Sequence, residues 1–285
     1  MAARVRTLPA SVAPVLVGTA LAVTDGVFRA GAFVAALLGA IFIQVGTNLA
    51  NDYSDARRGA DTEDRLGPVR VTAGGLVPPR QVLVATYATF GAAVLCGVYL
   101  VAVAGWELLV VGVLSIAAGV LYTGGPRPYG YEGLGEVFVF LFFGLAAVSG
   151  SSFAQTETWP WEAFVLAVPV GMLAAAILVV NNVRDAETDR RVGKNTLAVR
   201  LGPARARGLY AVLVFGAFAL APLPWVLGSL SAWLLLPLLA LPLGVRLVQT
   251  VQRHRDGPTL NEALARTGLL QLAFCVLLAA GIVAS

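Results

Sequence analysis

Two acidic segments of the chain carry side chains whose types and spacing could perform chemistry. The first contains NLANDYSD, directly after a wholly apolar run, and the stretch NDYSDARRGADTED holds five carboxylates. Its polar side chains at helical spacings of three and four are Asn48, Asn51 or Asp52, and Asp55. A helix would place these side chains on one face. Polar groups gathered at the end of an apolar helix are costly unless they bind something, so this face is a candidate binding site.

The second acidic segment repeats this pattern 130 residues later, from Asn51 to Asn181. It reads NNVRDAETDRR, and Asp189 follows Asp185 at a spacing of four, again on one helix face. Either segment alone fits a solvated loop at a membrane boundary as well as it fits a site. The matched pair favours one shared site.

Magnesium and diphosphate binding is the chemistry that these residue types support. Facing carboxylates repel each other unless cations lie between them, and oxygen ligands without histidine or thiolate suit Mg²⁺ held together with substrate phosphates. Gly59 allows the first helix to end, so Asp61 can fold back to the same place. The chain's single lysine, Lys194, lies five residues after Asp189, a placement that fits diphosphate binding and chance equally well. Basic residues interleaved with the acids, suited to further phosphate oxygens, are Arg57, Arg58, Arg65, Arg70, Arg184, Arg190, Arg191 and Arg200.

The composition places both motifs in a membrane protein. Of the 285 residues, 58% are apolar and only 13% are charged, whereas soluble domains are usually about a quarter charged. A bilayer-spanning helix needs about 20 apolar residues. Nine such runs lie at 8–24, 31–50, 81–103, 106–123, 134–153, 161–182, 206–227, 230–248 and 264–284. The expected fold is therefore one all-α integral membrane domain over residues 1–285, and a signal peptide at the first run is the less favoured interpretation.

The distribution of basic residues predicts the orientation in the membrane. Nineteen of the 20 Lys and Arg residues lie in or beside the N-terminus and the loops after the even-numbered runs, and only Arg29 lies on the other side. By the positive-inside rule these loops are cytoplasmic and the C-terminus is external. The net charge of +4 then reflects membrane topology, and we expect no nucleic-acid partner.

A third segment, YTGGPRPYGYEGLGE at 122–136, joins two predicted spans on the same side as the acidic motifs. Its glycines and prolines predict a tight loop. Tyr122, Tyr129 and Tyr131 add aromatic faces. The segment fits a packed turn and a substrate lid equally well.

At these residues the chain resembles the UbiA superfamily of intramembrane prenyltransferases. That family carries an Asn-Asp-x-x-Asp motif and an Asp-x-x-x-Asp motif, which 51-NDYSD-55 and 185-DAETD-189 match. Many members have a further Asp four residues after the position of Asp55. Here that position is Gly59, and Asp61 is the nearest substitute. This variation and the 122–136 segment resemble the menaquinone branch, whose enzymes are 1,4-dihydroxy-2-naphthoate polyprenyltransferases.

The resemblance implies nine helices around a central cavity in the lipid bilayer, capped by cytoplasmic loops. It implies transfer of a polyprenyl group from an allylic diphosphate to 1,4-dihydroxy-2-naphthoate, with Mg²⁺ and basic residues stabilising the departing diphosphate. The residues implied to hold Mg²⁺ are Asp52, Asp55, Asp61, Asp185 and Asp189. Four of these acids, Asp52, Asp55, Asp185 and Asp189, would serve catalysis together with Lys194. The implied substrate contacts are Asn48, Asn51, Asp61, Arg65, Arg70, Tyr122, Tyr131, Asn181 and Arg184.

Other functions remain open at this point. A UbiA-type enzyme could instead use 4-hydroxybenzoate, homogentisate, a chlorophyllide or a sugar phosphate, and the last would need extra polar groups for the sugar. A cation transporter could also place acids in membrane helices, commonly near the bilayer midplane. The predicted spans here carry hardly any charge at mid-depth, which favours a site at the membrane rim.

Overall fold

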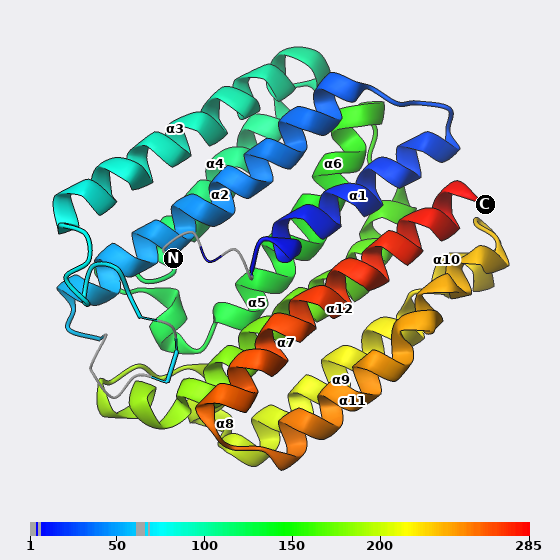
Figure 1. Cartoon of the computed structure of the whole chain (residues 1–285). Coiled ribbons are helices and arrows are strands. Elements are labelled where there is room, and N and C mark those ends of the chain that lie inside the picture. The colour runs from blue at the N-terminus through cyan, green and yellow to red at the C-terminus, as the bar shows by residue number, and fades with distance from the viewer. Residues whose placement is uncertain (1–3, 5–6, 61–65, 68) are drawn as a thin grey trace.

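The computed structural model describes residues 4, 7–60, 66, 67 and 69–285, and every regular element in these ranges is helical (Figure 1). The first half comprises α1 (Pro9–Thr24), α2 (Ala30–Arg57), α3 (Pro79–Ala104), α4 (Glu107–Leu121), η2 (Tyr129–Glu132), α5 (Gly135–Val139), η3 (Phe140–Ala146) and α6 (Ala147–Thr156). The second half comprises α7 (Trp161–Arg191), α8 (Leu197–Leu201), α9 (Pro203–Leu220), α10 (Leu223–Val226), η4 (Ala232–Ala240), α11 (Leu241–Arg253) and α12 (Gly257–Val283).

Seven helical segments in the described ranges are long and apolar enough to cross a membrane. They coincide with the second, third and fifth to ninth predicted spans. The first and fourth predicted spans form apolar helices of 16 and 15 residues, α1 and α4. At 1.5 Å per residue such helices reach only about 24 Å, less than the roughly 30 Å core of a bilayer. The all-helical fold is therefore confirmed for the described residues, and helix length and composition support seven of the nine predicted spans.

Helices α2 and α7 continue beyond their apolar parts into the two acidic motifs. After α2, Gly59 adopts a φ of 66°, the left-handed conformation that commonly closes a helix. After α7, Gly193 does the same with a φ of 74°. Figure 1 shows the last turns of α2 and α7 at one end of the bundle and the C-terminus at the other. The motifs thus occupy the final turns of two helices that end on the same side.

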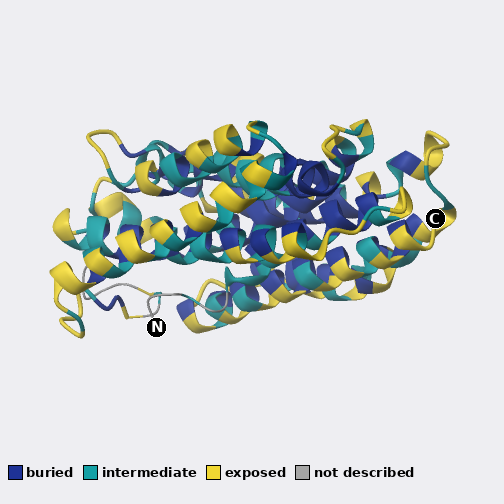
Figure 2. Ribbon diagram, turned by 90° about the horizontal axis from the view of Figure 1, so that it is seen from above, coloured by how far each residue is buried: buried dark blue, intermediate teal, exposed yellow. Residues whose placement is uncertain are grey.

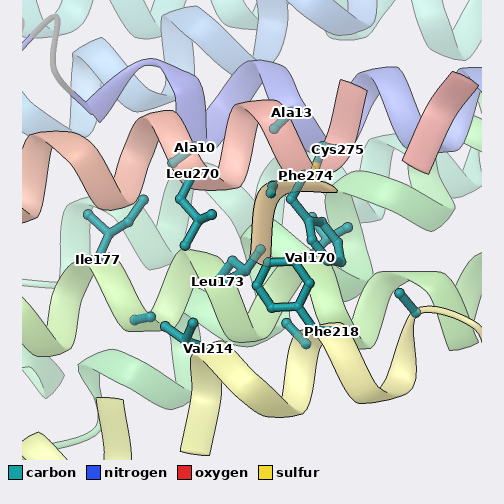
Figure 3. Close-up of a cluster of buried hydrophobic side chains, with 14 of the residues drawn as sticks. Ala10, Ala13, Val170, Leu173, Ile177, Val214, Phe218, Leu270, Phe274 and Cys275 are labelled. Carbon is teal, nitrogen blue, oxygen red and sulfur yellow. The ribbon is translucent and has the colours of Figure 1, made fainter. Parts of the chain in front are cut away.

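The core of the fold surrounds α7. Four segments pack against α7, namely α1, α9, α12 and η3. Within the most apolar part of α7, 72% of the residues are buried. Figure 2 shows the buried segments concentrated inside the bundle and the exposed ones along its margins. In Figure 3, Val170 and Leu173 of α7 lie beside Phe218 of α9 and Phe274 of α12. The two phenylalanine rings meet edge to face with centroids 5.2 Å apart, a favourable aromatic geometry.

The π-helical segment η3 crosses α7 at very close range. A Cβ atom on Gly144 would lie 2.7 Å from the Cα of Gly171, and one on Gly171 would lie 2.8 Å from the carbonyl oxygen of Phe140. Small residues permit such backbone approach between membrane helices, and π-helical turns are rare outside special positions. The two glycines therefore allow the continuous segment α5–η3–α6 to pack closely against α7.

A compact turn at residues 70–77 folds back onto α2. Val71 is buried with Leu49 of α2 and Val82 of α3 in a small apolar cluster. The backbone N–H groups of Leu76 and Val77 donate to the carbonyl oxygen of Val71 at 3.0 and 3.1 Å. This turn places the side chain at its start, Arg70, beside the last turn of α2.

Candidate active site

A cavity of about 500 Å³ lies within the bundle. Its lining follows α2 from Ala36 to Asp55, roughly 28 Å at 1.5 Å per residue. Apolar side chains such as Val101, Leu108 and Phe142 line one part of the cavity. Polar and charged side chains line its other end, namely Asn48, Asn51, Asp55, Arg70, Asn181, Asp185, Asp189 and Lys194. The cavity therefore joins a polar end to a long apolar compartment.

Asp55 occupies the centre of the polar end. This carboxylate is only 1% exposed, and its Oδ1 accepts a hydrogen bond from the hydroxyl of Tyr131 at 2.9 Å. Its Oδ2 lies 3.1 Å from Nη2 of Arg70 and 3.4 Å from Nζ of Lys194. Arg70 and Lys194 thus both face this carboxylate. Such a pair suits an anion with several oxygens, such as a diphosphate.

Lys194 is held by the loop between α4 and α5 as well as by Asp55. Its Nζ lies 4.8 Å from the centroid of the Tyr131 ring, within the range of a cation–π interaction. Its backbone N–H donates to the carbonyl oxygen of Asp189 at 2.8 Å, and the next N–H, of Asn195, donates to the carbonyl oxygen of Tyr131 at 3.0 Å. The hydrogen bond from Asn195 to Tyr131 thus joins the loop after α7 to the loop between α4 and α5, behind the polar end of the cavity.

The carboxylate of Asp185 is paired with its neighbour in sequence. Arg184 donates from Nε to Oδ1 at 2.7 Å and from Nη2 to Oδ2, a bidentate and buried arrangement. The same guanidinium donates to Oδ1 of Asn181 at 2.8 Å and to Oδ1 of Asn261 at 2.5 Å. Asp185 lines the cavity, whereas Arg184 lies behind the lining and fixes the orientation of Asp185.

Asp52 does not line the cavity, although its neighbour Asn51 does. Its Oδ2 accepts from the backbone N–H of Val71 at 3.2 Å, and its Oδ1 accepts from that of Thr72 at 2.9 Å. The side chain is 2% exposed, so both bonds are shielded from water. Asp52 therefore anchors the 70–77 turn and, through it, positions Arg70. From the sequence, either Asn51 or Asp52 could share a helix face with Asn48 and Asp55. The structure places Asn51 on that face, which lines the cavity.

The structure brings most of the predicted site residues together. Those that line the cavity are Asn48, Asn51, Asp55, Arg70, Tyr122, Asn181, Asp185, Asp189 and Lys194. Asp52, Tyr131 and Arg184 contact these residues or their loops from behind. Asp61 and Arg65 lie outside the described residues, so their predicted roles remain predictions.

An aromatic wall borders the middle of the cavity. The ring of Tyr129 stacks on Phe138 with centroids 4.0 Å apart and meets Tyr122 at 5.4 Å. All three rings line the cavity. Burial raises the pKa of the Tyr129 phenol, whose protonated hydroxyl donates to the carbonyl oxygen of Ala118 at 2.8 Å. The wall offers π faces to a developing positive charge.

Two supporting residues were not predicted from the sequence. Thr123 donates its hydroxyl to Oδ1 of Asn51 at 2.9 Å and orients this amide. Asn261 of α12, besides its bond to Arg184, donates to the carbonyl oxygen of Leu66 at 2.9 Å. Asn261 lies 77 residues from Arg184, and the polar residues beside it in α12 give no local signal that singles it out.

The donor set of the polar end fits Mg²⁺ that is shared with a diphosphate. The carboxylates of Asp55, Asp185 and Asp189 offer oxygen ligands, the kind that Mg²⁺ prefers. Within the described ranges, no three acidic, histidine or cysteine side chains gather into a preformed metal cluster. Mg²⁺ commonly keeps several waters and takes only one or two carboxylates together with substrate phosphates. The arrangement therefore suits an ion that arrives with a diphosphate.

Comparison with known proteins decides the family. Residues 11–267 match the sequence model of the UbiA prenyltransferase family. The chain belongs to this family. It is 42% identical over 280 residues to the 1,4-dihydroxy-2-naphthoate octaprenyltransferase of Mycobacterium tuberculosis, covering 97% of this chain and 94% of that one. It is 41% identical over 270 residues to the Escherichia coli enzyme of the same name, covering 93% and 88%.

Solved structures of UbiA homologues share the fold. The apo structure of a homologue from Aeropyrum pernix K1 superposes with a TM-score of 0.74 at 17% identity, covering 99% of this chain and 98% of that one. A homologue from Archaeoglobus fulgidus, solved bound to GPP and Mg²⁺, gives a TM-score of 0.66 at 16% identity, covering 98% and 99%. The resemblance inferred from NDYSD and DAETD is thereby confirmed for both family and fold.

Proposed function

We propose that this UbiA-family chain is a 1,4-dihydroxy-2-naphthoate polyprenyltransferase, which joins a polyprenyl group to the naphthoate and gives demethylmenaquinol, the reduced form of demethylmenaquinone. The observation that carries this proposal is one cavity that joins a polar end, where Arg70 and Lys194 lie among carboxylates, to a long apolar compartment. These are the two chemistries of a polyprenyl diphosphate. Relatives 34–42% identical over nearly their full length are named for this naphthoate substrate.

Ionisation of the allylic diphosphate is the step that the polar end serves. When the allylic C–O bond breaks, its electron pair stays on the diphosphate oxygen, and the charges of Arg70 and Lys194 stabilise that oxygen. Mg²⁺ held by Asp55, Asp185 and Asp189 would supply further positive charge for the leaving group. Asp52, Tyr131 and Arg184 hold these side chains in place, so little reorganisation is needed during the step.

Carbon–carbon bond formation follows beside the aromatic wall. The naphthoate ring attacks the allylic carbon, the carboxylate leaves as carbon dioxide, and its bonding electrons return to the ring. The faces of Tyr122, Tyr129 and Phe138 stabilise the allylic positive charge. The apolar compartment receives the isoprenoid tail and keeps water away from the cation.

Membranes that contain this chain are expected to convert 1,4-dihydroxy-2-naphthoate and a polyprenyl diphosphate to demethylmenaquinol when Mg²⁺ is present, and air oxidises this product to demethylmenaquinone during extraction. Chelation of divalent cations should abolish the reaction, because the leaving group then lacks its counter-ion. Mass spectrometry of the extracted lipid identifies the product, and membranes without the chain provide the control. Turnover of 4-hydroxybenzoate, homogentisate or another acceptor with none of the naphthoate would overturn the acceptor assignment while leaving the metal chemistry intact.

We further propose that all nine predicted spans cross the membrane as one domain over residues 1–285. The two short helices support this, because α1 packs against α6 and α12, and α4 packs against α2 and α3. The basic loops then place the polar end of the cavity in the cytoplasm.

This topology predicts on which side of the membrane each reporter fusion lies. A reporter inserted in the 55–70 loop should read as cytoplasmic, and one fused after Ser285 should read as external, because charge asymmetry sets orientation. Paired fusions to a phosphatase active only outside and a fluorescent protein active only inside measure this. Both reporters on the same side would remove one span from the proposal.

A further inference from the structure

We propose that Thr196 binds the substrate diphosphate, with its hydroxyl donating a hydrogen bond to a diphosphate oxygen beside Lys194. The inference deepens the proposed function and rests on it. Thr196 lines the cavity and is only 2% exposed. Its Oγ1 is fully buried and has no hydrogen-bond partner in the described structure. A buried hydroxyl without a partner costs free energy, so its persistence at a cavity wall calls for a ligand.

The local structure shows that this hydroxyl does not serve its own helix. Thr196 is the N-cap residue of α8, a position where a threonine side chain normally accepts from a backbone N–H in the first turn. No such hydrogen bond forms here. If packing alone mattered, a valine of the same shape would serve as well. The hydroxyl is therefore left for a partner in the cavity.

The backbone around Thr196 is fixed at the polar end of the cavity. Two residues earlier, Lys194 pairs with Asp55 at 3.4 Å, and the N–H of Asn195 donates to Tyr131 at 3.0 Å. On the other side, the carbonyl oxygen of Thr196 accepts from the N–H of Arg200 at 3.0 Å. A hydroxyl on a backbone held this firmly, two residues after Lys194, is preorganised to donate to an anion oxygen.

Thr188 provides a matched control within the same cavity. It also lines the wall, but its hydroxyl already donates to the carbonyl oxygen of Asp185 at 2.8 Å. A valine at Thr188 therefore removes a threonine hydroxyl from the cavity without removing a donor for the ligand. The two positions separate a general effect of losing a hydroxyl from the specific effect proposed for Thr196.

The test compares Thr196→Val, Thr196→Ser and Thr188→Val in the purified full-length chain. Binding of inorganic pyrophosphate in the presence of Mg²⁺ is measured by calorimetry, and KM for the prenyl diphosphate is measured by prenyl transfer. Thr196→Val is expected to weaken both by about tenfold, the usual effect of one hydrogen bond to a charged group, while KM for the aromatic acceptor stays unchanged. Thr196→Ser should retain near-normal values because it keeps the hydroxyl, and Thr188→Val should leave pyrophosphate binding unchanged.

Each outcome bears on the inference. If Thr196→Val binds pyrophosphate as tightly as the unaltered chain, or if Thr188→Val weakens binding equally, Thr196 has only a packing role. If Thr196→Val does not purify in folded form, Thr196→Ala provides the same comparison, with thermal unfolding as the check. The pyrophosphate measurement needs no acceptor. If Thr196→Val weakens pyrophosphate binding but the unaltered chain shows no turnover of the naphthoate, the proposed function is contradicted and the role of Thr196 in diphosphate binding is supported.

Discussion

Replacing Asp55 with asparagine is expected to lower prenyl-transfer activity about a hundredfold or more, since losing one preorganised electrostatic contact costs roughly 2.7–4 kcal/mol. Asparagine retains the size of the side chain and can still accept the hydrogen bond from Tyr131. It removes the charge that holds Arg70 and Lys194 in place and that would contribute to a metal ion. The measurement is the initial rate at saturating Mg²⁺ and saturating substrates.

The same change at the second motif is part of this prediction. Asp185→Asn should cause a loss of similar size, and the double variant should be little worse than either single one, because the two carboxylates serve one leaving group. All three variants should still insert and purify, since these residues lie at the end of the bundle and not in its apolar core. Near-normal turnover in either single variant would show that this aspartate does not take part in catalysis and is only a charge at the membrane boundary.

Asp52 offers a control inside the same motif. Asp52→Asn makes the identical chemical change three residues from Asp55, at a carboxylate outside the cavity lining. The amide oxygen can still accept the N–H of Thr72, so the loss is one acceptor for Val71, about 1 kcal/mol or roughly a tenfold effect at most. A loss as great as that of Asp55→Asn would show that Asp52 acts on the substrate or metal directly.

Gly171→Leu is expected to destabilise the fold by about 3 kcal/mol, because overpacking cannot be relieved where two backbones touch. A Cβ at this position would already lie 2.8 Å from the carbonyl oxygen of Phe140 and 3.1 Å from the Cα of Gly144. Thermal unfolding in detergent, followed by the fraction that remains monodisperse, measures the loss.

Gly91→Leu is the matched control for this change. Gly91 also lies inside an apolar helix, α3, but is exposed and has no atom within 4 Å of its Cβ position in the described structure. Leucine there should leave the unfolding temperature unchanged or raise it slightly, because leucine favours helix over glycine. Equal unfolding temperatures for the two variants would mean that α7 and η3 do not cross as closely as the structure shows.

Much of the fold follows from local properties of the chain. Run lengths and hydropathy predict membrane helices, and spacings of three and four place Asn48, Asn51 and Asp55 on one face, as the cavity lining confirms. The same reasoning could not choose between Asn51 and Asp52. Neighbours on a helix point only about 100° apart, so either could border a face defined by the other polar residues. The 70–77 turn decides the matter by offering two backbone N–H groups to Asp52.

By itself the sequence determined the family, the helices and the presence of two matched acidic motifs, because each of these depends on residues close together in the chain. The partners within the site depend on how distant helices pack. Lys194 reaches Asp55 across 139 residues, and Asn261 reaches Arg184 across 77. Hydrogen bonds and ion pairs act over a few ångströms, so only the tertiary structure decides which of many polar residues come within that range.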